Sequence, residues 1–450
     1  MNNMLQNMGE SFAVRIVDFL PEGLRTKVYG HGLRLDRPLS KKFVLKLAQT
    51  KEELEACFRL LHDEYVDAGV MKPDPSGLRI TYYHALPTTS VLMCRYESTV
   101  IGTVSLIREN KLGFPMQHAF NLDEVFQKGG NVAEVSALAI SKQFRMVKNR
   151  ILMPMLKFLY EYAEYRFDTQ HLVIAAHPRH MGFYEDILCF KRLSPYRIGH
   201  YDFVNGAPAA GGYIDLVEAK EIFQQKYGHL PAEKNLYHYF TAASLPNCQF
   251  PHRRFHTTTD PVMTPELIDY FFRQRTNLFL ALNTQEIQLL HALYDLPEYK
   301  RYLPPLSLIA SGEKSGQTHS RRFSVRCPAR MRIDVCGVWH TVSLVVYECS
   351  ETVFCAHCER PLQMGMSGEV EVNLGEHESC NLPVEIVRLS KHSNRVIMLR
   401  VLDTTGEQGR LWLKFVRALN KAAIGADLEE ATRFCDDALD MIPKRHTTAK

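Results

Sequence analysis

The stretch that decides the fold is Ala133-Glu134-Val135-Ser136-Ala137-Leu138-Ala139-Ile140, which is followed by Phe144-Arg145. Its apolar residues predict a buried strand that carries one carboxylate, at Glu134. A basic turn comes next, and residues 149–167 then place apolar side chains at helical spacing. The stretch therefore predicts a strand, a basic turn and a helix N-terminus in succession.

The flanking sequence alternates between strand and helix patterns. Strands are predicted at 43–48, 90–96, 100–107, 172–176 and 213–217. Thr50 and Glu53 have the spacing of a capping box and predict a helix that follows the first strand. Residues 181–188 predict another helix, and residues 72–87 predict a loop whose length suggests a functional role. Together these elements predict a mixed α/β sheet.

Beyond residue 217 the pattern changes twice. Residues 218–305 are helical in character, with helix starts at Thr264-Pro265 and at Asn283. After a glycine-rich linker at 311–317 the apolar period becomes two, which predicts a small antiparallel barrel. We therefore expect an α/β domain at 43–217, a helical connector at 218–316, a β-barrel at 317–420 and a helical tail at 421–450.

Composition limits the class of protein. The chain has 450 residues, 46% of them hydrophobic, and a formal charge of only +4, which does not favour a nucleic-acid binder. Its 11 cysteines lack framework spacing, and no apolar run reaches the length of a membrane span. A cytoplasmic protein is the expectation. The apolar stretch at 12–20 leaves two alternatives, packing on its own domain or peripheral contact with a membrane.

Glu134 is the candidate base for an acyl transfer. Aminolysis of a thioester requires a proton acceptor for the amine and hydrogen-bond donors for the developing oxyanion. Glu134 is placed for the first role, acting through water, and backbone N–H groups from Ser136 to Leu138 for the second. An ordinary salt bridge at Glu134 is the alternative.

A basic cluster marks the predicted helix N-terminus. It consists of Arg145, Lys148, Asn149 and Arg150. Free N–H groups and the helix dipole favour phosphate oxygens at such a position, although a solvated charge run is the alternative. Tyr184 is a candidate proton donor to the leaving thiolate, and its alternative is a core tyrosine.

Residues 43–217 resemble the long-chain N-acyl amino acid synthases, the FeeM-like branch of the GNAT superfamily that is related to autoinducer synthases. The blocks that carry the resemblance are His62-Asp63-Glu64-Tyr65, Gly102-Thr103-Val104-Ser105-Leu106, Gly113-Phe114-Pro115-Met116, the Glu134 stretch, His177-Pro178-Arg179-His180 with Phe183-Tyr184, and Val204-Asn205-Gly206-Ala207-Pro208.

The resemblance implies transfer of a long acyl chain from the phosphopantetheine of acyl carrier protein to the amine of an amino acid. It makes Glu134 the acid of the family's Glu-x-Ser strand and Arg145 the basic residue at the phosphopantetheine turn. Residues 146–150 lack the glycines of coenzyme A-using relatives, which agrees with a carrier-protein donor. A basic rim for that acidic partner is expected from Lys142, Arg145, Lys148, Arg150 and Lys157.

The C-terminal region resembles a PilZ domain, a receptor for cyclic di-GMP. Arg322 and Arg326 match the Arg-x-x-x-Arg pair, with Arg321 beside them, and Ser350 matches the second signature. Glu348 and Val353 depart from that signature, so a barrel that has lost its ligand and binds partners is the alternative.

No metal site is predicted. Residues 355–358 contain two cysteines and a histidine but lack a second pair of ligands, so a plain turn with buried thiols is expected. The predicted function is thus an N-acyltransferase tuned by a PilZ-like domain. The alternatives are an acyl-coenzyme A-dependent enzyme and an inactive signalling adaptor that binds cyclic di-GMP or protein partners.

Overall fold

The computed structural model describes residues 35, 39–201, 203, 206–306, 323–335, 338–376, 378–390 and 393–421. The strands of its larger sheet are β1 (Phe43–Leu47), β2 (Thr89–Tyr96), β3 (Thr99–Arg108), β4 (Asn131–Ile140), β5 (Thr169–Ala176), β6 (Lys191–Tyr201), β7 (Ala207–Asp215) and β8 (Cys248–Gln249). They are ordered β6-β7-β5-β4-β3-β2-β1-β8, and β4 pairs with β5 in parallel. The mixed α/β domain is as predicted.

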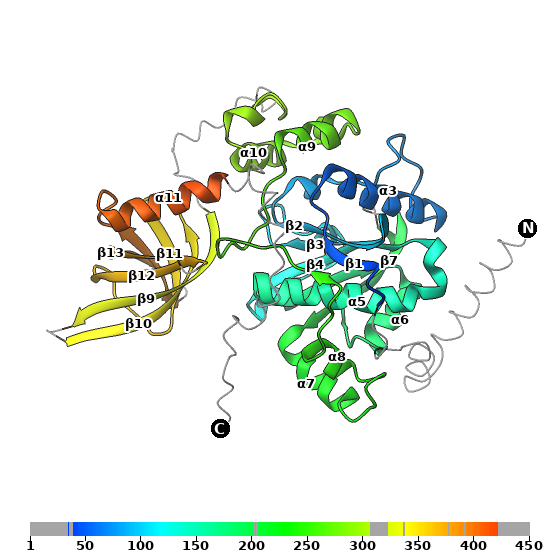
Figure 1. Ribbon diagram of the computed structural model, residues 1–450, viewed down its shortest axis with the longest axis horizontal. Helices are drawn as coiled ribbons and strands as arrows, with labels where there is room; N and C mark the ends of the chain where they lie inside the picture. Colours follow the sequence, from blue (N-terminus) through cyan, green and yellow to red (C-terminus); the bar gives the residue numbers. More distant parts are fainter. Residues whose placement is uncertain are drawn as a thin grey trace, which may run out of the picture.

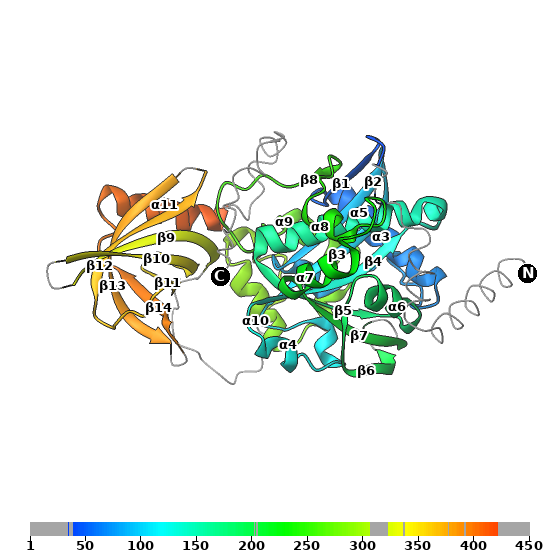
Figure 2. The ribbon, with the colours of Figure 1, turned by 90° about the horizontal axis from the view of Figure 1, so that it is seen from below.

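Helices cover both faces of this sheet, as Figures 1 and 2 show. Alternate side chains of β2 separate the two cores, because successive residues of a strand point to opposite faces. Val91 and Met93 pack with α3 (Lys51–Asp67), whereas Leu92 and Cys94 pack with α5 (Lys148–Glu161). The predicted capping box at the start of α3 is present.

Two further helices follow strands of the sheet. Helix α6 (Pro178–Asp186) lies between β5 and β6, and α7 (Leu216–Tyr227) follows β7. Helix α8 (Leu236–Thr241) packs against α7. Strand β6 is absent from the predicted elements. Most of its side chains are exposed or half-buried, so it has no apolar alternation by which to recognise it.

The connector packs on the α/β domain. It forms α9 (Pro265–Asp269), a π-helical turn at Tyr270–Gln274, α10 (Thr284–Leu293) and short 3-10 turns at Leu278–Ala281 and Pro297–Tyr299. Phe271 and Tyr294 are buried in the same core as Phe58 of α3. The Tyr294 hydroxyl also donates to the carbonyl of Ala85, 2.5 Å away. This face of the sheet is therefore completed by the connector.

The C-terminal region forms a closed six-stranded antiparallel barrel, as predicted. Its strands are β9 (Phe323–Val335), β10 (Val338–Cys349), β11 (Val353–Cys358), β12 (Ser367–Gly375), β13 (Glu378–Ser390) and β14 (Ser393–Val401). Helix α11 (Glu407–Lys421) packs on the barrel through the fully buried Trp412. The prediction of a plain turn at 355–358 is wrong, because β11 pairs with both β10 and β14.

The segment from residue 250 to 260 precedes α9 and runs between the α/β domain and the barrel, with contacts on both sides (Figure 1). On the α/β side, Asp260 accepts a hydrogen bond from the Tyr162 hydroxyl at 2.6 Å and pairs with Arg108 at 3.3 Å and with Arg253. On the barrel side, Thr257 bridges to Val325. The predicted tail at 421–450, apart from Lys421, and the apolar stretch at 12–20 lie outside the described residues.

Candidate active site

Glu134 lies in the middle of the large sheet and is almost fully buried, with 2% of its surface exposed. Its β4 position is in register with Ile107 of β3 and Val173 of β5. Burial raises the pKa of the Glu134 carboxyl to about 8, against an ordinary value of 4.5. The salt-bridge alternative fails among the described residues, since none of them forms an ion pair with this carboxylate.

The turn at Gly113 brings a hydrogen-bond donor to Glu134. Gly113 has a φ of +71°, which favours glycine, and the Gln117 side chain accepts from the Phe114 N–H at 2.6 Å. The 3-10 turn Pro115–His118 then directs the Met116 N–H to Glu134 Oε2, 3.0 Å away. This hydrogen bond and one from Ser136 lower the pKa of Glu134, but less than burial raises it.

A β-bulge follows Glu134 on the same strand. Ser136 pairs with Ser105 and Ala139 with Thr103, so Ala137 and Leu138 together face the single residue Val104. Ala137 has a φ of +55°, a conformation that is costly for a residue with a side chain. Pairing of β4 with β5 ends at Val135, just before the bulge. The strands thus part where the predicted oxyanion-binding N–H groups lie.

A recess of about 510 Å³, including its open mouth, lies beside Glu134 and the bulge. Its walls come from α3, the loop before β2, strands β3, β4 and β5, the end of β6 and the segment that follows it. The lining residues are Leu61, Tyr65, Arg79, Thr81, His84, Ser105, Ile107, Glu134, Ser136, Ala137, Ala175, Tyr201 and Phe203. Two of the predicted catalytic residues, Glu134 and Ser136, are therefore together in one cavity.

Several lining residues are absent from the predicted site. Arg79 and His84 come from the long loop at 72–87, whose length is the one sequence signal that points to them. Burial lowers the pKa of His84 to about 4, so its imidazole is neutral at pH 7. Tyr201 lies at the end of β6, far from Glu134 in the chain, and no sequence pattern identifies it.

Tyr184 lies next to this cavity but does not line it. It is half-buried on α6, in edge contact with Phe183 and Phe190. Burial raises its pKa to about 12, and the neighbouring Tyr65, which lines the recess, adds to this effect. The hydroxyl is therefore protonated at pH 7, and its role as a proton donor stays a prediction.

The basic turn is followed by a helix, as predicted. A 3-10 segment spans Lys142–Val147 and α5 begins at Lys148. Arg150 is exposed, whereas the side chains of 145–149, and with them Arg145, Lys148 and Asn149, lie outside the described part of the structure. Lys157 does not belong to the expected basic rim, because it is 1% exposed and pairs with Glu161 at 2.7 Å.

Of the predicted nucleotide ligands, Arg326 and Ser350 are described, and Arg321 and Arg322 are not. Arg326 forms a 2.9 Å ion pair with Asp168 of the α/β domain. Ser350 is fully buried, and its hydroxyl bonds to the backbone of Val353. The Trp412 indole N–H donates to the carbonyl of Ser350 at 3.2 Å. In this arrangement Ser350 stabilises a turn, and its ligand role stays a prediction.

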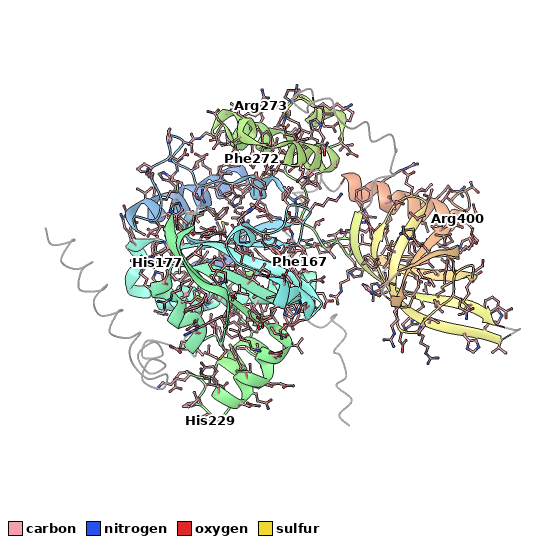
Figure 3. All side chains as sticks on the ribbon, turned by 180° about the vertical axis from the view of Figure 1, so that it is seen from behind. Phe167, His177, His229, Phe272, Arg273 and Arg400 are labelled. Carbon is pink, nitrogen blue, oxygen red and sulfur yellow. The ribbon has the colours of Figure 1, made fainter. Side chains whose placement is uncertain are left out.

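Histidine and acidic side chains do not gather into a metal site in the described ranges, where no group of three or more ligand residues is found. His177, labelled in Figure 3, instead caps α6 by accepting the Arg179 N–H at 3.3 Å. Across the described helices, none combines the length and apolar character that crossing a bilayer requires.

Comparison with models of known protein families gives one match, which covers part of the chain. Residues 56–214 match the model of the family described as N-acyl amino acid synthase FeeM. This match supports an N-acyltransferase and covers Glu134, the bulge and the recess residues Leu61 to Phe203. A search of curated proteins found no match.

Three solved structures are among those similar to the chain. FeeM, an N-acyl amino acid synthase from uncultured soil microbes, is 22% identical, with 40% of this chain and 93% of FeeM covered and a TM-score of 0.35. The coenzyme A-dependent acyl-homoserine lactone synthase BjaI is 14% identical, with 47% of this chain and 95% of BjaI covered and a TM-score of 0.34. YcgR from Escherichia coli in complex with c-di-GMP is 20% identical, with 24% of this chain and 48% of YcgR covered and a TM-score of 0.20.

Proposed function

We propose that residues 56–214 transfer a long acyl chain from a phosphopantetheine thioester to the amine of an amino acid. One observation carries this proposal. A buried carboxylate with a pKa of about 8 lines a recess at the point where β4 and β5 part, inside the region that matches the N-acyl amino acid synthase family. A base with that pKa is matched to an ammonium group that must lose a proton near neutral pH.

Glu134 has the role of general base in the proposed reaction. The ammonium group of the acceptor gives a proton to Glu134, directly or through a water molecule, and the free amine attacks the thioester carbonyl. The C–N bond forms, the C–S bond breaks and the thiolate leaves, taking a proton either from Glu134 or from Tyr184. The products are an amide, a thiol and one proton released to solvent.

The β-bulge supplies the second catalytic element. The carbonyl oxygen becomes negatively charged as the amine adds, and N–H groups that are already oriented stabilise it without reorganisation. Residues 136–138 are the proposed donors, since Ala137 and Leu138 leave the regular ladder with β3. The positive φ of Ala137 is consistent with a backbone held for this purpose.

The proposed donor is acyl carrier protein. The turn at 146–150 contains no glycine, which suits a single phosphate better than a pyrophosphate that must approach the backbone closely. The purified protein is given acyl carrier protein and coenzyme A charged with the same acyl chain. Preference for the carrier-bound chain supports the proposed donor. Preference for acyl-coenzyme A would show that coenzyme A is the donor, and the proposed acyl transfer to an amine would be unaffected.

The proposed role of the barrel is regulation by cyclic di-GMP. Arg326 now pairs with Asp168 across the domain junction, so an anionic ligand would compete for this guanidinium. Cyclic di-GMP is titrated against the full chain and against Arg326→Ala. Binding that the substitution abolishes supports the role, whereas no binding at tens of micromolar leaves the barrel as an interaction module.

The decisive experiment for the enzyme is lipid analysis. Cells that overproduce the wild-type chain or Glu134→Gln are extracted, and amide-linked lipids are identified by mass spectrometry. A new amide in the first culture alone supports the proposal. Absence of any new amide, with acyl carrier protein still bound, favours an inactive adaptor.

A further inference from the structure

Arg166 is a cation of the domain junction that has no counter-charge among the described residues. It ends the π-helical turn Tyr162–Arg166 that follows α5, two residues before Asp168, and it is half-buried. Within the described ranges, no hydrogen bond or ion pair involves its guanidinium. Burial lowers the pKa of Arg166, and the neighbouring guanidinium of Arg253 lowers it further. The folded protein therefore holds this charge at a cost in free energy.

Two carboxylates of the junction are already paired with other arginines. Asp168 forms its 2.9 Å ion pair with Arg326, which belongs to β9 of the barrel. Asp260 pairs with Arg108 at 3.3 Å and also with Arg253. When the unpaired arginine is added to these residues, guanidinium groups outnumber carboxylates. An anion bound at the junction would reduce this imbalance.

Basic side chains from three parts of the chain meet at this point. Arg166 comes from the α/β domain, Arg326 from the barrel and His256 from the segment between them. Partial burial lowers the pKa of His256, and both guanidinium groups lie near enough to lower it further. The Arg326 N–H donates to the His256 carbonyl at 2.8 Å, which fixes β9 to this segment. Phe167, which follows Arg166, lies on the side of the α/β domain that faces the barrel (Figure 3).

We propose that Arg166 and Arg326 together bind one phosphate group, so that the ligand is held by both domains at once. The inference places a ligand residue in the α/β domain, and it rests on the proposed role of the barrel for Arg326 alone. A guanidinium can hold a phosphate by two parallel hydrogen bonds, and the phosphate charge offsets both arginines. The side chain of Asp168 is 30% exposed, so it can turn to water when Arg326 leaves it for the ligand.

The proposed site adjoins the strands that line the catalytic recess. Strand β5 begins three residues after Arg166. At the start of β4, the Asn131 side-chain amide donates to the carbonyls of Phe167 and Asp168, 3.3 and 3.1 Å away. The two strands then run in parallel past Glu134 to the point where they part. A ligand bound by Arg166 therefore acts on the segment from which both strands start.

Titration calorimetry of the full chain tests the site. The probes are cyclic di-GMP, guanosine 5′-monophosphate and inorganic phosphate, which separate a nucleotide ligand from a free anion. For the probe that the wild-type protein binds most tightly, we expect Arg166→Met to weaken binding by roughly 10- to 100-fold, the loss typical of a charge-assisted hydrogen bond. Arg166→Lys should retain part of the affinity, because it keeps the charge but lacks the planar fork.

Arg59→Met is the matched control, because it removes an exposed arginine of the same domain that pairs with Glu55 on α3. Thermal unfolding checks the fold of each variant, and loss of an unpaired, half-buried charge should leave the Tm unchanged or raised. Wild-type affinity in Arg166→Met overturns the inference, and loss of binding in Arg326→Ala alone would then leave the proposed role of the barrel standing. Binding of guanosine 5′-monophosphate or phosphate that depends on Arg166, without binding of cyclic di-GMP, supports the site and refutes the cyclic dinucleotide as its ligand. No binding of any probe overturns both.

Discussion

Replacement of Glu134 by glutamine tests both the base and the reason for its raised pKa. Glutamine has nearly the same shape, and its amide oxygen can still accept the Met116 N–H, so the fold is retained. Burial holds the pKa of the carboxyl at about 8 in the folded protein, whereas the unfolded chain has the ordinary value of 4.5. At about 1.4 kcal/mol per pH unit, this difference corresponds to about 5 kcal/mol.

The direction in which stability changes with pH follows from proton binding to Glu134. Between pH 4.5 and about 8 the folded protein keeps a proton on Glu134 that the unfolded chain has lost, so the free energy of unfolding falls as the pH rises. The contribution is complete below pH 4.5 and is lost as the pH passes through about 8. Glutamine does not titrate, so the variant should become more stable than the wild-type protein at pH 9, by up to about 5 kcal/mol.

Denaturant unfolding at a series of pH values measures this difference, and turnover is measured on the same samples. The wild-type kcat/KM should rise tenfold per pH unit and level off near pH 8, and the variant should have no turnover. Glu97→Gln is the control, since Glu97 is exposed and lies outside the recess. Parallel stability curves for the wild-type protein and Glu134→Gln would refute the burial argument, and retained turnover would remove Glu134 from the mechanism.

Three further outcomes are expected. Ala137→Val should lower the free energy of unfolding by about 1–3 kcal/mol and also lower turnover, because a branched residue is strained at a φ of +55°. Ala137→Gly should keep both the stability and the turnover of the wild-type protein. Thermal unfolding measures the first quantity and an acyl-transfer assay the second. Trp412→Ala should destabilise the barrel by about 3–5 kcal/mol in denaturant unfolding, because it leaves a cavity beneath α11. Asp168→Asn should change stability by less than about 1 kcal/mol, since its pair with Arg326 is partly exposed, yet should tighten binding of an anionic ligand at Arg326 in calorimetry.

The elements with strong local signals were predictable from the sequence. The capping boxes at Thr50 and Asn283 are both present, because they depend on residues three positions apart. The barrel was predictable from its period of two. Strand β11 is not predicted, because its cysteines and histidine suggest a turn, although most of its side chains are buried and it pairs with β10 and β14.

The recess was predictable only in part. Glu134 is recognisable because it is the single carboxylate of an apolar strand, a pattern that the eight residues 133–140 contain in full. Arg79 and Tyr201 meet Glu134 only through the order of the strands in the sheet, which no local pattern encodes. The Tyr201 hydroxyl is buried without a described hydrogen-bond partner, so no local contact in the sequence predicts its position.

The connector has a consequence for how this protein can be divided. The family match ends at residue 214, but Phe271 and Tyr294 of the connector complete the core behind α3, and Tyr294 is hydrogen-bonded to Ala85 in the loop at 72–87. That helix and that loop are two walls of the recess. A fragment that stops at 214 would expose an apolar face and would remove this support from two walls of the recess. The same connector contacts the barrel where Thr257 pairs with Val325. A movement of the barrel would therefore be transmitted through the connector to the walls of the recess.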